Sequence, residues 1–481
     1  MNLFSFLRIE FSILGIVALT MIFPICAAIA FDEFSVVPAF AIPMAVFLIL
    51  AALFLLAGRK KKITLSIRSA FVVVAFAWIF CSLLGAIPFY FSGAIPNWTN
   101  AMWESVSGFS TTGATILDDV EAIPNSINLW RTQTHWLGGM GIVALTVALF
   151  PLLGVGGFQL IKAETTGPEK GKVTPKIATT AKVLWLIYCG VTILEIIILK
   201  IVGMNFFDAV VHSFSTVGTG GFSNKNLSIG AYDSVAVDVV CTIFMFLCGI
   251  NFSLYFYLLT KKFSDIFKNS ELKAYLAIFF FSVLAITLVN KNFYGGFFTS
   301  LRFSSFQIAS IISTTGFGTS NYAMWPNAAQ FLLFLLFFIG GCSGSTGGGI
   351  KVIRWVVMGK QAHNEFLKML HPHGVFSIQL NGRAGRKDIV FNVASFFTLY
   401  FLLLALTAVF GAAAGLDIQT ALSGAASMMG NVGPAFGALN PSANCGFLPA
   451  ALKWWYMFAM LAGRLELYTM IIFFVPDFWK K

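Results

Sequence analysis

A short phrase of the form Thr/Asn-x-Gly occurs four times along the 481-residue chain. The four copies are Thr111-Thr112-Gly113, Thr216-Val217-Gly218, Thr314-Thr315-Gly316 and Asn431-Val432-Gly433. Glycine tolerates the positive φ angles that turn successive carbonyl oxygens to one side, and a Thr hydroxyl can add another oxygen. Rings of such oxygens replace the water around a monovalent cation in membrane pores. The four phrases therefore predict an oxygen-lined filter for monovalent cations.

Each phrase follows a stretch of helical character, over residues 101–110, 207–215, 306–313 and 418–427. About ten residues rise about 15 Å, which is half the thickness of the membrane hydrocarbon. A half-helix entering from outside points its partly negative C-terminal end at the membrane centre, where it favours a cation. One such phrase could simply be a glycine cap on a buried helix. Four copies at equivalent positions, about a hundred residues apart, favour a pore.

The composition indicates an integral membrane protein. Apolar residues make up 58% of the chain and charged residues 11%, and the mean hydropathy is +0.84, which leaves too little polar surface for a soluble globule. Ten apolar runs long enough to span the bilayer begin near residues 11, 34, 69, 132, 183, 234, 274, 327, 389 and 454. The net charge of +11 does not indicate a nucleic-acid partner, because the basic residues do not cluster on one tail or helix face.

Most Lys and Arg residues fall in alternate loops between these runs. This bias predicts a multi-pass protein with both termini in the cytoplasm. The expected fold is all-α: two N-terminal crossings within 1–62, then four helix, pore loop and helix units of the same orientation around a central pore. These units are expected over 69–153, 179–260, 272–357 and 388–477. Their shared orientation separates them from the inverted repeats of many carriers.

The pore phrases also carry a family resemblance. Ser110-Thr-Thr-Gly-Ala-Thr115, Ser215-Thr-Val-Gly-Thr-Gly-Gly-Phe222, Ser313-Thr-Thr-Gly-Phe-Gly318 and Gly430-Asn-Val-Gly-Pro434 resemble the four pore loops of the Trk/Ktr/HKT superfamily of potassium transporters. The stretch Gly340 to Lys351 and the phrase Gly463-Arg-Leu-Glu466 resemble the bacterial Trk branch, and the two extra N-terminal crossings favour the TrkH/TrkG type over the shorter Ktr type. The resemblance implies that K⁺ is the transported ion and that the glycines at 113, 218, 316 and 433 are filter residues.

A glycine-rich segment interrupts the second helix of the third unit. It consists of Gly340, Gly341, Cys342, Ser343, Gly344, Ser345, Thr346, Gly347, Gly348 and Gly349. So many glycines predict a break in the helix, and the resemblance implies a movable gate beneath the filter. A nucleotide-binding loop would need a preceding strand and a Gly-Lys-Ser/Thr ending, which the segment lacks; a flexible linker without function is the other alternative.

Charged residues inside apolar runs need an explanation because burying them is costly. Arg464 is expected to face the permeation path near the gate, where its charge opposes leakage of K⁺. The alternative is a buried ion pair with Glu466 or Glu195 that only holds helices together. At the outer mouth, acidic residues including Glu104, Asp118 and Asp119 could concentrate cations, although a solvated loop also explains them.

The membrane potential alone can drive the uptake of a cation, so no enzyme activity is needed to supply energy. A membrane potential supplies about 2.3 kcal/mol per charge per 100 mV, roughly fiftyfold accumulation, and no catalytic constellation or organic cofactor motif is visible. We expect gated uptake through a channel-like pore, with a K⁺/H⁺ or K⁺/Na⁺ symporter as the alternative. The resemblance implies a homodimer in the bacterial inner membrane and a cytosolic nucleotide-binding regulator of the TrkA type. The basic loops 162–182, 261–273 and 351–387 offer its docking face.

Overall fold

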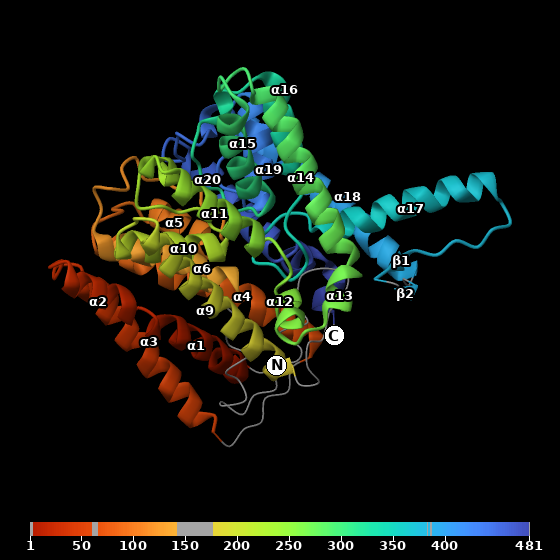
Figure 1. Ribbon diagram of the computed structural model, residues 1–481. Helices are drawn as coiled ribbons and strands as arrows, with labels where there is room; N and C mark the ends of the chain where they lie inside the picture. The colour runs from red at the N-terminus through yellow and green to blue at the C-terminus, as the bar shows by residue number, and fades with distance from the viewer. Residues whose placement is uncertain (1–2, 60–65, 142–176, 382, 385–386, 481) are drawn as a thin grey trace.

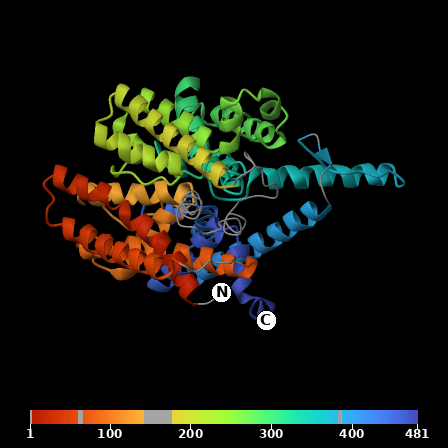
Figure 2. The ribbon, with the colours of Figure 1, turned by 90° about the horizontal axis from the view of Figure 1, so that it is seen from below.

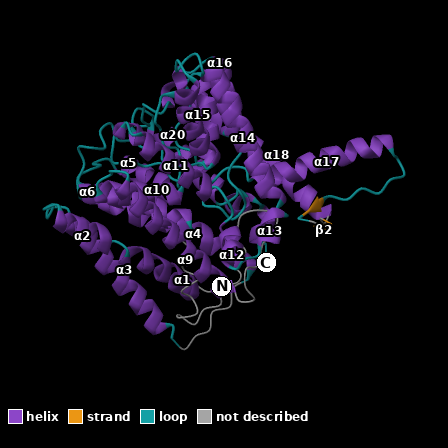
Figure 3. Ribbon diagram, viewed as in Figure 1, coloured by secondary structure: helices purple, strands orange, loops and turns teal. Residues whose placement is uncertain are grey.

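The fold is almost entirely helical in the computed structural model, which describes residues 3–59, 66–141, 177–381, 383–384 and 387–480 (Figure 3). In this part of the chain the strands are β1 (Gln379–Leu380) and β2 (Arg383–Ala384), which pair antiparallel. The all-α prediction is confirmed. The end of the first predicted unit, most of the basic loop 162–182 and Arg386 lie outside the described residues.

The long apolar stretches are formed by α1 (Leu3–Leu19) with the short α2 (Ile22–Ala30), and by α3 (Val37–Ala57), α4 (Ile67–Phe91), α9 (Ile177–Ile201), α14 (Ser270–Asn290) and α18 (Lys387–Ala413). Among the described residues, with α1 and α2 taken together, they give six spans long and apolar enough to cross a membrane, or seven if α11 (Val235–Cys248) and α12 (Phe252–Leu259), bent by 93°, form one more. Large apolar side chains such as Ile42, Leu53 and Phe281 are exposed along them, as expected for contact with lipid. The chain is therefore a multi-pass membrane protein.

Three further helices at predicted crossings are shorter. They are α6 (Asn125–Gly139), α16 (Asn327–Leu336) and α20 (Ala450–Arg464). The count of ten crossings stays a prediction.

Four short helices lie among the long ones: α5 (Trp98–Phe109), α10 (Phe206–Gly218), α15 (Phe297–Ile312) and α19 (Ile418–Gly430). Each packs against the helix before it and the helix after it, as α5 does against α4 and α6 (Figure 1). Three of them begin at a side-chain cap, where Asn97, Asn205 or Asp417 accepts a hydrogen bond from a backbone N–H of the first turn. These are the predicted half-helices, and α15 begins nine residues earlier than expected.

In the described part of the chain, the helices that follow the second, third and fourth half-helices are broken. A gap of fifteen residues separates α16 from α17 (Val352–Leu370), which confirms the predicted break at the glycine-rich segment. In addition, α11 bends into α12 at Gly249 to Asn251, and α20 ends at Arg464 before two residues with positive φ, Glu466 and Leu467. These two breaks were not predicted, because only the third carries a run of glycines.

The remaining elements are short: α13 (Phe263–Phe267), α21 (Tyr468–Ile471), α22 (Pro476–Trp479), η2 (Ser228–Tyr232), η3 (Tyr322–Met324), η4 (Gly437–Leu439) and η5 (Ile472–Phe474). Helix α17 projects from the body of the molecule in both views (Figures 1 and 2). The N-terminal helices pack on the rest through α4 and α6. Glu33, between α2 and α3, caps α6 from outside, because its carboxylate accepts the N–H groups of Asn125 at 2.6 Å and Ser126 at 2.9 Å.

Candidate ion-conduction site

The four short helices end in the same backbone conformation. Each is followed by a residue in the left-handed region: Thr111 (φ 56°), Thr219 (54°), Thr314 (60°) and Asn431 (54°). Two residues later comes a glycine with positive φ: Gly113 (75°), Gly221 (83°), Gly316 (83°) and Gly433 (96°). Because L-residues rarely adopt this region, its recurrence identifies equivalent positions in the four loops.

The hydrogen bonds confirm this equivalence. The residue between each left-handed residue and its glycine donates its N–H to the carbonyl of a serine five positions earlier. These bonds run from Thr112 to Ser107 (2.9 Å), Gly220 to Ser215 (2.8 Å), Thr315 to Ser310 (2.8 Å) and Val432 to Ser427 (3.0 Å). This is the six-to-one bond of a Schellman helix end. The four loops therefore repeat one local structure.

The second loop corrects the sequence prediction. Thr216, Val217 and Gly218 are the last residues of helix α10, and the residues equivalent to Thr111-Thr112-Gly113 are Thr219-Gly220-Gly221. The prediction was wrong because the stretch Thr-Val-Gly-Thr-Gly-Gly contains two candidate registers three residues apart. A signal for the correct register was present: a serine precedes the left-handed residue by four positions in all four loops, at Ser107, Ser215, Ser310 and Ser427.

The four glycines bring the loops together in a closed cycle. A methyl group at Gly113 would overlap the carbonyl oxygen of Gly220 in the second loop, and one at Gly221 would overlap that of Thr315 in the third. In the same way, a methyl group at Gly316 would overlap the carbonyl oxygen of Val432, and one at Gly433 would overlap that of Thr112. Each loop thus contacts the next, and the fourth contacts the first. Both the positive φ and this close approach require glycine at these positions.

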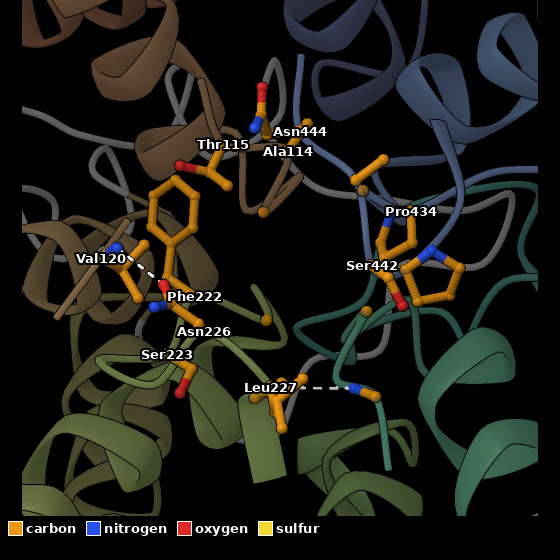
Figure 4. A pocket seen from close by; sticks show the side chains of 18 of the residues that line it. Ala114, Thr115, Val120, Phe222, Ser223, Asn226, Leu227, Pro434, Ser442 and Asn444 are labelled. Atoms are coloured by element: carbon orange, nitrogen blue, oxygen red, sulfur yellow. Dashed lines mark hydrogen bonds between the residues drawn. The ribbon is translucent and has the colours of Figure 1, made fainter. Parts of the chain in front are cut away.

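A cavity of about 360 Å³ opens on one side of this cycle (Figure 4). All four glycines line it, together with residues that follow them in each loop, including Thr115, Phe222 and Pro434. Since a water molecule occupies about 30 Å³ of liquid, the cavity has room for about a dozen waters. The four loops therefore meet at the floor of a vestibule large enough for a hydrated cation.

Hydrogen bonds between loops close the rim of the vestibule. Asn444 donates to Asp118 at 2.7 Å, and Asn226 donates to Asp119 at 2.8 Å. The bond from Asn226 is the main reason that the pKa of Asp119 lies below its usual range. Glu104, by contrast, is not a mouth residue, because it is completely buried and bonded to Arg131. The prediction that Glu104 lies at the solvated mouth was wrong.

Neutral groups hold the third and fourth loops. The Ser310 hydroxyl donates to the Phe317 carbonyl at 2.7 Å, and Ser427 donates to the Gly433 carbonyl at 2.8 Å. The phenol of Tyr322, from the third loop segment, donates to the carbonyl of Ala435 in the fourth at 3.0 Å. These bonds fix carbonyl groups immediately next to the cycle of glycines.

The glycine-rich segment lies against the ends of two half-helices. The N–H of Gly348 donates to the hydroxyl of Thr314 at 2.6 Å. A methyl group at Gly347 would lie 2.7 Å from the Ser313 carbonyl, and one at Gly348 would lie 2.7 Å from that of Gly430. The segment therefore packs directly against the left-handed residues of the third and fourth loops.

The same segment is attached to the break between α11 and α12. Cys342 donates its N–H to the Gly249 carbonyl at 2.8 Å, and Phe252 donates to the Gly344 carbonyl at 3.0 Å. The buried carboxylate of Glu271 accepts the N–H groups of Ser343 at 2.6 Å and Ile353 at 3.1 Å. Sequence reasoning missed Glu271, which lies at the start of α14 like many ordinary capping residues.

Arg464 also contacts this segment. Its guanidinium donates to the carbonyls of Thr346 (2.7 Å), Gly138 (2.6 Å) and Gly139 (2.8 Å), so it joins the glycine-rich segment to the end of α6. Glu466, its expected partner under the alternative hypothesis, forms an ion pair with Arg354. Lys351, which is buried, donates to the carbonyl of Gly347. Long cationic side chains thus connect the helix breaks.

Apolar spans surrounding four short helices that end in glycine-centred carbonyl loops define a multi-pass membrane transport protein rather than an enzyme. Comparisons with known proteins agree. A sequence model of the TrkH family, described as cation transport protein, matches residues 37–301 and 297–481. The chain is 39% identical over 486 residues to the Trk system potassium uptake protein TrkH of Halomonas elongata, with all of both chains covered. It is 39% identical over 430 residues to TrkH of Escherichia coli, with 88% of each covered.

A solved structure is also similar along the whole chain. The crystal structure of the potassium transporter TrkH from Vibrio parahaemolyticus matches with a TM-score of 0.88 at 34% identity, covering 100% of both chains. The chain belongs to the TrkH family.

Proposed function

We propose that this chain takes up K⁺ through a channel-like selectivity filter formed by its four glycine-centred loops. The observation that carries the proposal is the closed cycle in which Gly113, Gly221, Gly316 and Gly433 each meet a carbonyl of the next loop. Backbone carbonyls at such a constriction can replace the hydration shell of a K⁺ ion. The relatives from H. elongata and E. coli are named potassium uptake proteins, which supports K⁺ as the ion.

The proposed filter residues are Thr111 to Gly113, Thr219 to Gly221, Thr314 to Gly316 and Asn431 to Gly433. Two positions beyond each glycine the loops differ, with Thr115, Ser223, Gly318 and Ala435. A filter that is irregular at this level holds fewer equivalent sites than a fourfold channel. We therefore expect Rb⁺ to pass and Na⁺ to be excluded less completely than in a K⁺ channel.

The glycine-rich segment 340–349 is the proposed gate, and Arg464 is the proposed latch. The segment packs against the inner ends of two loops, and Arg464 binds its Thr346 carbonyl. A run of glycines has little intrinsic helix preference, so alternative conformations cost little. Deleting part of 341–349 is expected to raise ion flux and leave ion preference intact; unchanged flux in an assembled deletion variant would exclude the gate.

The proposed topology has ten crossings: the two within 1–62 and two in each of the units 69–153, 179–260, 272–357 and 388–477. Both termini lie in the cytoplasm of a bacterium, and the protein resides in the inner membrane. Uptake is driven by the membrane potential and the ion gradient. Cysteine labelling from each side of the membrane, at Arg59 and at Asp233 for example, tests this orientation.

Control is proposed to come from a second protein. The relatives are named as parts of a Trk system, and we propose a homodimer of this chain bound to a cytosolic nucleotide-binding regulator of the TrkA type. Neutralising Lys351, Arg354, Arg383 and Arg386 is expected to abolish co-purification with that regulator. Lys351 and Arg354 are buried, with Lys351 bonded to the Gly347 carbonyl and Arg354 paired with Glu466. A variant limited to Arg383 and Arg386 therefore separates loss of docking from loss of folding.

Flux into liposomes tests the function itself. Purified protein is reconstituted, and uptake is measured with gradients of K⁺, Rb⁺, Na⁺ and Li⁺. The proposal expects K⁺ and Rb⁺ flux with a reversal potential set by those ions alone. A reversal potential that shifts with the H⁺ or Na⁺ gradient would instead establish a coupled symporter, and absence of K⁺ flux would refute both.

A further inference from the structure

A buried ion pair lies behind the outer ends of the first two loops. Glu104 on α5 and Arg131 on α6 are 2.8 Å apart between Oε1 and Nε, and their side chains are 0% and 1% exposed. Removing two charges from water costs about as much as their mutual attraction returns. The pair is therefore a poor source of stability, and what it holds in place is the more informative question.

Arg131 touches both loops at equivalent positions. Its guanidinium donates to the carbonyl of Ser223 at 3.0 Å and to the hydroxyl of Thr115 at 3.3 Å. Thr115 lies two residues beyond Gly113, and Ser223 lies two residues beyond Gly221. One planar, fixed group thus sets the separation of two loops just outside the glycines.

Glu104 fixes the first loop from the other side. Its carboxylate accepts the Thr115 hydroxyl at 2.9 Å and the backbone N–H of Ile116 at 3.1 Å. Asn128 orients the guanidinium, because its side-chain oxygen accepts from Arg131 at 2.9 Å. With these bonds, neither charged group can move without displacing a loop.

An aromatic ring extends this contact to the vestibule. The guanidinium of Arg131 lies 4.3 Å from the centre of the Phe222 ring, and the ring of His135 stacks on Phe222 at 4.2 Å. Phe222 and Arg131 both line the vestibule, and Phe222 directly follows Gly221. The position of the guanidinium therefore also determines where the second loop forms the wall of the vestibule.

The equivalent positions in the other two loops are held without charge. The carbonyl of Gly318 accepts the backbone N–H of Gly230 at 3.1 Å. The carbonyl of Ala435 accepts the hydroxyl of Tyr322 at 3.0 Å. Only the first and second loops, among these four positions in the described chain, are joined through a charged side chain.

We propose that Arg131, held by Glu104, is a positioning residue that sets the discrimination of K⁺ from Na⁺. It keeps the outer ends of the first two loops from closing in around a smaller ion. In the third and fourth loops, neutral hydrogen bonds hold the equivalent carbonyls in place. This inference rests on the proposed filter, and it adds the residue pair that fixes the filter's width.

The test replaces Arg131 by Lys, which keeps the charge beside Glu104 but cannot bridge Thr115 and Ser223 as a planar fork. The purified variant is reconstituted in liposomes, and the K⁺/Na⁺ permeability ratio is taken from reversal potentials under opposed K⁺ and Na⁺ gradients. We expect the ratio to fall by about tenfold, the factor that loss of a charge-assisted bond typically produces. K⁺ flux itself is expected to persist.

Arg302 provides the matched control. It forms an ion pair with Asp238 on α11 at 2.7 Å from Nε and a longer one with Asp233 at 3.8 Å, and neither of these partners lines the vestibule. Arg302→Lys is expected to keep the wild-type ratio. A merely structural role for Arg131 would lower the yield or thermal stability of Arg131→Lys and leave the ratio unchanged, and that result would overturn the proposal.

If Arg131→Lys does not assemble, the K⁺/Na⁺ permeability ratio of Thr115→Val tests the proposal instead. It removes the hydroxyl that binds both charged groups and leaves the ion pair intact; an unaltered ratio there also overturns the proposal. Failure of the underlying function is distinguishable, because wild-type liposomes would then show no K⁺ flux. Wild-type flux with unchanged ratios in the variants refutes the positioning role alone.

Discussion

The outer and inner sides of the glycine cycle are built from different kinds of contact. On the outer side, hydroxyl and backbone groups fix individual carbonyls, as Ser427 does for Gly433 and Tyr322 does for Ala435, and the cation Arg131 is held in place by its ion pair with Glu104. On the inner side, long flexible cations reach across the helix breaks, as Arg464 does to Thr346 and Gly138. Short contacts lose little entropy on forming, whereas a long side chain can exchange one carbonyl for another.

This difference separates two physical tasks. Discriminating ions of similar charge requires carbonyl positions that do not adjust to the smaller ion, so each must be held by its own bond. Opening and closing requires a segment with nearly equal alternative conformations, such as 340–349.

Replacing Gly221 by Ala is expected to have the largest effect. The new methyl would overlap the Thr315 carbonyl at a backbone φ of 83°. Left-handed strain and overpacking cost about 1–3 kcal/mol each, so K⁺ flux should fall by about a hundredfold. Liposome flux measures it. Gly190→Ala on α9, where the methyl meets open space, should conduct normally; equal flux in both variants would contradict the close approach of the second and third loops.

Arg464→Ala tests the inner side. Without the guanidinium, the carbonyls of Thr346, Gly138 and Gly139 lose a common donor, and the proposed gate is released. We expect K⁺ flux to rise by about tenfold with an unchanged K⁺/Na⁺ ratio, the effect of losing the charge-assisted bond to the gate at Thr346. Arg464→Lys should give an intermediate flux. A folded Arg464→Ala variant with wild-type flux would reduce the residue to a link between helices.

Tyr322→Phe returns to the outer side and removes a single neutral bond. The Ala435 carbonyl would lose its donor at 3.0 Å, and a neutral hydrogen bond contributes about 1 kcal/mol. The K⁺/Na⁺ permeability ratio should fall by about threefold to fivefold. Tyr400→Phe is the control, because the buried Tyr400 hydroxyl has no hydrogen-bond partner among the residues that the structure describes. A fall of the same size in both variants would show that the effect is not specific to the fourth loop.

The sequence predicted the half-helices and three of the four loops because local patterns determine them. The glycines at 113, 316 and 433 each follow one unambiguous helix end. Around Gly218 and Gly221 the sequence fits the loop pattern in two registers. Which register forms depends on how far α10 continues, and packing against neighbouring helices decides this. The breaks after α11, at Gly249, and after α20, at Leu465 to Leu467, were missed for a similar reason. One glycine near a helix end is compatible with a membrane helix, and tertiary contacts decide whether the helix breaks.

The pairing of charges was the least predictable feature. Glu104 looks like a mouth residue in sequence, because Thr115 and Arg131, which it binds, are 11 and 27 positions away. Nothing in the spacing indicates that they meet. Buried ion pairs form between elements that only the folded arrangement brings together, so composition and periodicity cannot reveal them.

Asp119 at the vestibule rim should show the smallest effect. Asp119→Asn is expected to lower K⁺ flux by about twofold or less at low ionic strength, and the difference should vanish in concentrated salt, which screens exposed charges. The hydrogen bond from Asn226 lowers the pKa of Asp119, so its charge is present above the ordinary carboxylate pKa and is lost only as the pH falls through the lowered value. The ratio of wild-type to variant flux should therefore stay constant from pH 8 to pH 5. Asp265→Asn, on the exposed helix α13, is the control, and a ratio that changed within this range would show that another group titrates at the rim.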